Sequence, residues 1–339
     1  MIKKHISMAK EEEQGKLGIT YLKTIWASVM LQKEGIVNES TQLKHNYVTA
    51  VFDALGIGIE PTYKYVFESS PSFEQFEDWI LSNGQVSQEM INLFNLAISS
   101  SNQKLQDQTT ENNVLDKKAL EHWDKEGYII IPNAITEDDI EASLDVIYTH
   151  LQIDPNNTST WYEDHPLKQG IMVQLFRHPQ LDKNRFSKKI QQAYQQLWQR
   201  TDLIVSNDRV SFNPPETDNY KFPGPNLHWD VSLKRPIPFG LQGLLYLTDT
   251  PENQGAFTLV PGFHRKIDSW LENLPHTVNP RTYDFQQLGT KPIAAKAGDF
   301  IIWNQMLPHG SSPNTGMKPR VVQYINYQPI HREIETEWI

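Results

Sequence analysis

The sequence contains no cysteine. Disulfide bonds are therefore excluded, and any bound metal must be held by histidine and carboxylate side chains. Long apolar runs are also missing, because no stretch approaches the roughly 18 apolar residues of a membrane span. The polar N-terminus, MIKKHISMAKEEEQGK, lacks the apolar segment of a secretory signal. We therefore expect a soluble, cytoplasmic protein without a membrane partner.

Basic residues are fewer than acidic residues. The 339 residues include 31 Lys and Arg against 41 Asp and Glu, a formal net charge of -10. A nucleic-acid-binding protein usually presents a basic face, so we expect no nucleic-acid partner. Hydrophobic residues make up 38% of the chain and aromatic residues 11%, which is enough for a packed core. The length predicts one large domain or two ordinary ones.

Apolar residues recur at helical spacing in the first hundred residues. Candidate helices cover residues 17–30, 41–55, 72–84 and 86–98. We predict a small all-α domain over residues 1–100 and a polar linker over residues 101–113. No cluster of metal-ligating residue types occurs in this region. Its role is unknown: the helices either recognise or present a substrate, or serve as a structural or dimer contact.

After the linker, Pro and Gly punctuate short apolar runs. Two helices, 115–125 and 137–151, are expected on either side of a short strand at 128–131. The later runs are LIVSNDRVSFNPP, GLQGLLYLTD, GAFTLVPG, KPIAAKAGDFIIWN and PRVVQYINY. Many short strands separated by turns favour a sandwich or barrel of jelly-roll type. Residues 114–339 are therefore predicted to be a mainly β domain with flanking helices.

The segment NLHWDVSL, residues 226–233, contains a candidate metal site. His228 and Asp230 are two positions apart, so on a strand both side chains project from one face. His309 follows another apolar run 81 positions after His228 and supplies a third ligand. Two histidines and one carboxylate form the facial triad of non-haem Fe(II) oxygenases. An isolated H-x-D is more often a surface pair, and the other histidines are expected to be surface or packing residues.

Arg320 lies eleven positions after His309, beyond the turn sequence GSSPNTGMKP. The strand RVVQYINY would point Arg320 inward together with Val322 and Tyr324. A buried arginine needs an anionic partner, and its guanidinium fork matches a carboxylate. A dicarboxylate co-substrate would supply one, whereas a surface salt bridge is the commoner fate of an arginine.

These motifs together resemble the phytanoyl-CoA dioxygenase family. The resemblance rests on NLHWDVSL, on ENQGAFTLVPGFHR (252–265) and on AGDFIIWNQMLPHGSSPNTGMKPRVVQY (297–324). The family shows an H-x-D, an N-G-A-L-x-x-x-P-G-S-H-R element, a G-D stretch before a distal His, and an Arg about eleven residues later. The segment EHWDKEGYIIIPNAITEDDIEASL (121–144) is similar to the family's opening helix, strand and helix. The similarity covers roughly residues 115–330.

The resemblance implies a double-stranded β-helix, a jelly-roll or cupin-like fold, with Fe(II), 2-oxoglutarate and O2 as cofactors. It assigns iron to His228, Asp230 and His309. It assigns 2-oxoglutarate to Arg320 and Ser311. Many relatives have Lys-Pro-Pro before the H-x-D where this chain has Asn213-Pro214-Pro215, so Asn213 is a candidate substitute for that lysine. The element PGSHR is PGFHR here, a change expected to affect packing.

The implied activity is hydroxylation of an unactivated C–H bond in a small-molecule, carrier-bound or CoA-bound substrate. Halogenating relatives have a small residue where Asp230 stands, which disfavours halogenation. Trp229, Tyr220 and Phe222 are candidate pocket residues. Two alternatives stay open: a non-catalytic jelly-roll binding module, and a metal-dependent isomerase or hydrolase in which Arg320 binds a substrate carboxylate. The oligomeric state is left open.

Overall fold

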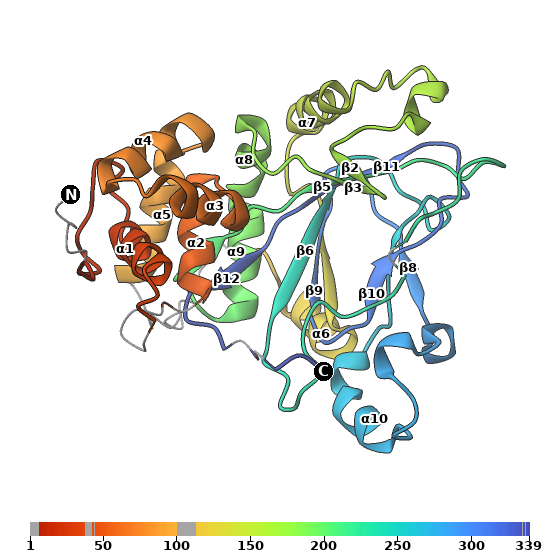
Figure 1. The fold of residues 1–339 in the computed structure, drawn as a ribbon. Helices are drawn as coiled ribbons and strands as arrows, with labels where there is room; N and C mark the ends of the chain where they lie inside the picture. Colours follow the sequence, from red (N-terminus) through yellow and green to blue (C-terminus); the bar gives the residue numbers. More distant parts are fainter. Residues whose placement is uncertain are drawn as a thin grey trace. The chain divides into compact units, whose positions relative to one another are not determined.

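The computed structural model describes residues 7–37, 43, 45–99, 113–224, 226–333, 335 and 337–339. The chain divides into two compact units (Figure 1). The first unit contains Met1–Leu105, Arg200–Asn207 and Pro329–Arg332, and the second contains Gln106–Gln199, Asp208–Gln328 and Glu333–Ile339. Two short segments from the later part of the chain thus group with the N-terminal helices. The predicted linker, apart from Asn113, lies outside the described residues.

The first unit is mainly helical. Its described elements are α1 (Leu22–Lys33), α2 (His45–Leu55), α3 (Ile59–Ser69), α4 (Phe73–Asn83), α5 (Gln88–Ser99) and the strand β4 (Leu203–Val205). Helix α4 begins with a capping box formed by Ser72 and Gln75, in which each side chain accepts a hydrogen bond from the other residue's backbone N–H. Helix α3 was not predicted. Its Pro61 lies in the first turn, where proline is tolerated, so this residue does not prevent the helix.

Antiparallel sheets form the centre of the second unit. One sheet has seven strands in the order β1-β9-β6-β11-β5-β3-β2, and the other has three in the order β10-β7-β8. Their strands are β1 (Tyr128–Ile131), β2 (Lys168–Gln169), β3 (Met172–Val173), β5 (Val210–Asn213), β6 (Leu241–Tyr246), β7 (Phe257–Leu259), β8 (Lys291–Ile293), β9 (Phe300–Asn304), β10 (His309–Ser311) and β11 (Arg320–Tyr324). A further strand, β12 (Tyr327–Pro329), belongs to neither of these two sheets. An isolated antiparallel bridge between His228 and His309 extends the smaller sheet beyond β10.

Helices flank these sheets. They are α6 (Lys117–Glu126), α7 (Glu137–Leu151), α8 (Pro179–Arg185), α9 (Lys188–Trp198) and α10 (Ile267–Asn273), with short 3-10 turns η1 (Thr158–Tyr162), η2 (Phe263–Arg265), η3 (Pro280–Thr282) and η4 (Phe285–Leu288). Two of them, α6 and α7, confirm the predicted helices and enclose the predicted strand β1. Among the described residues, no helix has the length and apolar character needed to cross a membrane.

The expectation of a mainly β domain needs correction. The antiparallel sheets are present, but their strands are only two to six residues long, and helices contain more of the described residues than strands do. Helices α8 and α9 were not predicted. The apolar positions Ile190, Ala193, Tyr194 and Leu197 are buried at helical spacing, so this pattern in α9 was visible in the sequence.

An apolar core fills the space between the two sheets of the second unit. Leu244, Ile301 and Val322 from the large sheet pack in one cluster with residues of the small sheet. The fully buried hydroxyl of Tyr246 joins the sheets, because it donates to the Ile293 carbonyl at 3.1 Å and accepts from the Phe257 amide at 2.8 Å. Burial raises the pKa of Tyr246 to about 12. The sheets are therefore held in a fixed relation beside the candidate site.

Candidate functional site

The three predicted metal ligands meet in space. One ligand atom from each of His228, Asp230 and His309 lies within 4.8 Å of the other two. His228 Nε2 is 3.2 Å from Asp230 Oδ1, and His309 Nε2 is 3.1 Å from Asp230 Oδ2. Their backbones are joined as well, since the His228 and His309 amides each donate to the other's carbonyl. No other cluster of this kind occurs in the part of the chain that the structure describes.

Both imidazole rings are oriented by backbone carbonyls. His228 Nδ1 lies 2.7 Å from the Asn226 carbonyl, and His309 Nδ1 lies 3.0 Å from the Leu307 carbonyl. A carbonyl can only accept a hydrogen bond, so each Nδ1 carries the hydrogen. In the neutral ring the lone pair is then on Nε2, which faces Asp230. This is the tautomer with which a histidine binds a metal through Nε2.

The pKa shifts of Asp230 and His228 show that the side chains of the cluster interact strongly. Burial would raise the pKa of Asp230, but hydrogen bonds from His228 and His309 hold it far below the usual range of a carboxyl. Burial would lower the pKa of His228, but Asp230 and the Asn226 carbonyl raise it. A proton on the imidazole and a metal ion both satisfy the carboxylate, so metal binding must release protons.

Gln242 is a second support of Asp230 that the sequence did not reveal. Its Nε2 donates to Asp230 Oδ2 at 2.7 Å, and its Oε1 accepts from Trp303 Nε1 at 3.1 Å. Gln242 and Trp303 are direct partners in the β6–β9 ladder. The β6–β9 register therefore positions the side-chain amide of Gln242, and this amide in turn positions Oδ2 of Asp230.

Arg281, in η3, holds the backbone around the same ligand. Its guanidinium donates to the Trp229 carbonyl at 3.0 Å and to the Val231 carbonyl at 2.6 Å. These carbonyls belong to the residues on either side of Asp230. The guanidinium also lies 4.4 Å from the centroid of the Trp338 ring. Arg281 thus restrains a segment that has no strand ladder of its own.

A cavity of about 380 Å³ opens next to the triad. Its wall includes all three candidate ligands and the apolar side chains of Met172, Phe257 and Trp303. Further polar groups come from Asp208, Arg209, Asn326, Gln242, Ser311 and Tyr324. The volume is within the range of small-molecule sites.

The predicted pocket aromatics lie elsewhere. Trp229 is only 2% exposed, packs against Phe263 and Phe285, and donates from Nε1 to the Met306 carbonyl. Tyr220 and Phe222 are not among the residues that line the cavity. The structure therefore places Trp229 in the aromatic core. Residues 228–230 form no strand beyond the single bridge at His228, so these aromatic contacts and the bond to Met306 are what hold Trp229 in the core.

Arg320 is fully buried, with 0% of its surface exposed. Its Nη2 donates to Ser211 Oγ at 2.9 Å, whereas Nε and Nη1 have no hydrogen-bond partner among the described residues. Asn213 lies opposite Arg320 in the β5–β11 ladder, and its Oδ1 is also buried without a partner. A buried guanidinium with free donors is costly unless an anion binds to it. These orphaned donors fit the distal carboxylate of 2-oxoglutarate.

Ser311 lies on β10, two residues after His309, and is 6% exposed. Two residues along a strand is one full period, so the serine is on the face of the sheet that bears His309. It also contributes to the cavity wall. The donor set of two imidazoles and one carboxylate fits Fe(II), and the unpaired guanidinium fits the co-substrate.

Two imidazoles, a carboxylate and a buried arginine with unpaired donors on antiparallel sheets fit an enzyme of the Fe(II)- and 2-oxoglutarate-dependent superfamily. A sequence model of the phytanoyl-CoA dioxygenase family matches residues 123–322, which is more than half of the chain. The chain belongs to the phytanoyl-CoA dioxygenase family, which uses Fe(II), 2-oxoglutarate and O2.

A relative from Dictyostelium discoideum carries the name "Putative phytanoyl-CoA dioxygenase". It is 23% identical over 260 residues, which cover 62% of this chain and 74% of the relative.

Among solved structures, AviO1 from Streptomyces viridochromogenes matches with a TM-score of 0.46 and 17% identity, over 65% of this chain and 97% of that one. HygX from Streptomyces hygroscopicus, with nickel, 2-oxoglutarate and hygromycin B bound, matches with a TM-score of 0.44 and 16% identity, over 63% of this chain and 88% of that one.

Proposed function

We propose that the protein is a dioxygenase that hydroxylates an unactivated C–H bond of a small-molecule, carrier-bound or CoA-bound substrate. In the balanced reaction, the substrate R–H, 2-oxoglutarate and O2 give R–OH, succinate and CO2. The observation that carries the proposal is the pairing of a complete two-histidine, one-carboxylate cluster with a fully buried arginine that has two unpaired donors. An ordinary structural arginine would have partners for these donors.

The strand order supports a double-stranded β-helix. Four strands of the large sheet lie in the order β9-β6-β11-β5, and the small sheet continues from the His228 bridge through β10, β7 and β8. Along the sequence the chain crosses repeatedly between these two sheets, which is how a jelly roll is wound. In this fold, the triad and the arginine would both face the interior between the sheets.

Each candidate residue has a distinct proposed role. His228, Asp230 and His309 hold the iron, which when bound supplies the activation of O2. Arg320 binds the distal carboxylate of 2-oxoglutarate, and Ser311 contributes a hydroxyl. Asn213 has no charge, and its Nδ2 already donates to the Ser312 carbonyl at 3.2 Å, so it can assist only through its second amide hydrogen.

The apolar cavity wall limits access of water to the reacting centre and orients the substrate. Asp230 occupies a coordination position that a halogenating enzyme would need for chloride, so we propose hydroxylation. A cytoplasmic location is part of the proposal, because a reducing compartment keeps iron as Fe(II). For the first unit we propose a separate domain, joined by the linker at 101–113, which recognises or presents the substrate; a purely structural role is the alternative.

Succinate formation tests the proposed reaction. The purified protein with Fe(II), 2-oxoglutarate and O2 should form succinate, and mass spectrometry of candidate substrates should show a gain of one oxygen atom. A binding module would form no succinate. An isomerase or hydrolase would convert its substrate without consuming 2-oxoglutarate.

A further inference from the structure

Asp208 and Arg209 place opposite charges side by side on the wall of the cavity that contains the triad. They directly precede β5, and their side chains are 34% and 37% exposed. Neither residue belongs to a motif, and the proposed iron and co-substrate roles use neither. Charged groups in a ligand cavity fix the orientation of what binds there.

The carboxylate of Asp208 is held in place by its neighbours. Asn326 Nδ2 donates to Asp208 Oδ2 at 3.2 Å, and the Arg209 amide donates to Asp208 Oδ1 at 2.8 Å. The Oδ1 atom of Asn326 is itself fixed, because it accepts from the Gly243 amide at 2.8 Å. The carboxylate therefore has a defined orientation before any ligand arrives.

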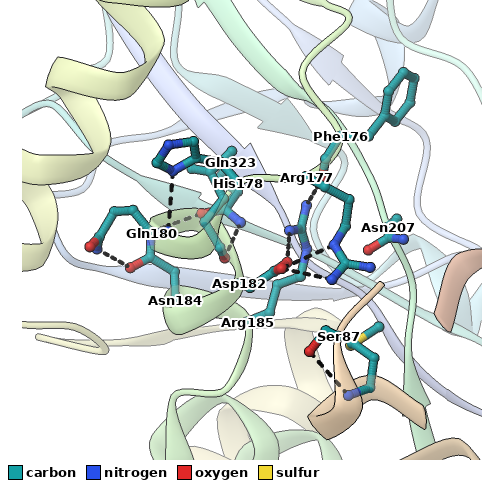
Figure 2. Close-up of polar contacts among 12 residues, drawn as sticks. Ser87, Phe176, Arg177, His178, Gln180, Asp182, Asn184, Arg185, Asn207 and Gln323 are labelled. Atoms are coloured by element: carbon teal, nitrogen blue, oxygen red, sulfur yellow. Dashed lines mark hydrogen bonds and ion pairs between the residues drawn. The ribbon is translucent and has the colours of Figure 1, made fainter. Parts of the chain in front are cut away.

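A buried network fixes the backbone behind it. Figure 2 shows Asp182 between Arg177 and Arg185, with Arg177 bound through Nε and Nη2 and Arg185 through Nη1. Arg185, which is 0% exposed, also donates from Nη2 to the Asp208 carbonyl at 2.8 Å and to the Phe176 carbonyl at 2.6 Å. Two guanidinium groups share one carboxylate here. Burial raises the pKa of Asp208, and the positive charges of Arg209 and Arg185 offset part of that rise.

The guanidinium of Arg209 lies close to the Asp208 carboxylate but donates no hydrogen bond to it through Nε. Its Nε is 3.8 Å from Asp208 Oδ1, which is too long for a hydrogen bond, and Nε has no other partner among the described residues. The guanidinium lies 5.8 Å from the centroid of the Phe176 ring, a cation–π contact. Both charges therefore retain capacity for a ligand.

We propose that Asp208 and Arg209 form the substrate-recognition pair and that the substrate is a free α-amino acid. Asp208 binds its ammonium group, and Arg209 binds its carboxylate. The side chain of the amino acid then extends toward the triad along Met172, Phe257 and Trp303, so oxidation falls on a side-chain carbon. This inference rests on the proposed oxygenase function and names its substrate class.

An acyl thioester fits the cavity less well. It brings no positive charge to Asp208, so that carboxylate would be covered with only two uncharged donors within hydrogen-bond distance, and covering a charge without a close counter-charge is costly. The cavity, about 380 Å³, is also near the lower end of the range for ligand sites. A small zwitterion satisfies both charges at once.

The first experiment uses the full-length wild-type protein with Fe(II), 2-oxoglutarate and O2. Succinate is measured with a panel of free proteinogenic and non-proteinogenic amino acids, with their N-acetyl and methyl ester derivatives, and with acyl-CoA thioesters. We expect at least one free amino acid to stimulate succinate formation and to gain one oxygen atom, while its two derivatives stimulate roughly tenfold less or not at all. Stimulation only by thioesters, or by no free amino acid, overturns the inference. A protein that forms no succinate under any condition contradicts the proposed function itself.

The second experiment assigns each charge to its residue. Asp208→Asn should raise the KM for the amino acid roughly ten- to a hundredfold, because a hydrogen bond to a charged group is lost, and should narrow the preference over the N-acetyl derivative. Arg209→Gln should instead reduce the preference for the free amino acid over its methyl ester, measured as succinate formation. The exposed residues Asp145 and Arg265 provide matched controls, Asp145→Asn and Arg265→Gln, which should leave both preferences unchanged.

Thermal unfolding shows whether each variant is folded. Asp208→Glu keeps the charge and should recover part of the preference for the free amino acid. If a variant is unfolded, the derivative panel on the wild-type protein decides. Folded variants that retain both preferences overturn the assignment of the pair.

Discussion

The metal cluster and the surroundings of Arg320 both place polar groups away from solvent, but they differ in how many of these groups have hydrogen-bond partners. In the cluster, both nitrogens of each histidine and both oxygens of Asp230 have partners within the protein. Around Arg320, two guanidinium nitrogens and the Oδ1 of Asn213 have no partner among the residues that the structure describes. The cluster can therefore be ordered before the metal binds, because protons between the imidazoles and the Asp230 carboxylate take the place of the metal ion. The backbone of Arg320 is ordered by its pairing with Asn213 in the β5–β11 ladder.

This difference predicts how each region responds to its ligand. Metal binding exchanges existing interactions for new ones and releases protons. Binding of 2-oxoglutarate adds interactions where none existed, so it should stabilise the fold by mass action. Substitutions that remove a group from either region test whether the two are independent.

Loss of a metal ligand should have the largest effect. His309→Ala or His228→Ala removes one of three ligands, and we expect loss of stoichiometric Fe(II) binding and of succinate formation. Anaerobic metal titration with elemental analysis measures the stoichiometry. The exposed His276 provides a matched control, His276→Ala, which should bind one iron per chain. Unchanged stoichiometry in both ligand variants would remove the metal assignment.

Arg320→Ala should rank second and affect only the co-substrate. Removing one partner of a buried charge pair costs about 3–5 kcal/mol, so the KM for 2-oxoglutarate should rise by roughly two to three orders of magnitude. Iron binding should persist. In the wild type, 2-oxoglutarate should raise the unfolding temperature, and in Arg320→Ala it should not. A variant with wild-type co-substrate affinity would show that the unpaired donors serve another ligand.

Gln242→Leu should produce an intermediate effect, confined to the metal side. The variant removes the donor to Asp230 Oδ2 and leaves all three ligands in place. Supporting hydrogen bonds of this kind change metal affinity by roughly 10- to 100-fold. The exposed Gln287 offers the control Gln287→Leu. If Gln242→Leu weakens 2-oxoglutarate binding as strongly as metal binding, the two regions are not independent.

The smallest effect should come from pH. In the metal-free protein the pKa of His228 is raised above its ordinary 6.5, so below that raised value the metal must displace a proton. Metal affinity should then fall by up to about tenfold per pH unit as the pH is lowered, and level off above the raised pKa. The contribution of His228 to the stability of the metal-free fold has the opposite sign, since it is lost as pH rises through the same range. Equal metal affinity at about pH 6 and pH 8 would contradict this coupling.

The convergence of His228, Asp230 and His309 and the burial of Arg320 could be predicted from sequence spacing. His228 and Asp230 are only two positions apart, and Arg320 follows His309 after one turn. The core position of Trp229 could not be predicted from strand alternation, because residues 228–230 form no strand, and it depends on contacts with Phe263 and Phe285. The amphipathic spacing of α9, by contrast, was readable in the sequence.

Gln242, Asp208 and Arg281 could not be found in the same way. Gln242 acts through its register with Trp303, and Asp208 acts through Asn326, which is more than a hundred positions later. Such partners depend on which strand ends meet, and a single sequence does not encode that locally. The assignment of Arg200–Asn207 and Pro329–Arg332 to the first unit has the same origin.

That assignment constrains the order in which the chain can fold during synthesis. Within the first unit, the Asp53 carbonyl accepts from Asn207 Nδ2, and the Tyr47 hydroxyl lies 2.7 Å from His331 Nδ1. N-terminal domains usually fold as units while the rest is still being made. Here the helices emerge first but cannot complete their own contacts until residue 332 has left the ribosome. The first unit to be translated is thus among the last to be finished, and its exposed apolar surfaces must wait for the whole oxygenase region to be synthesised.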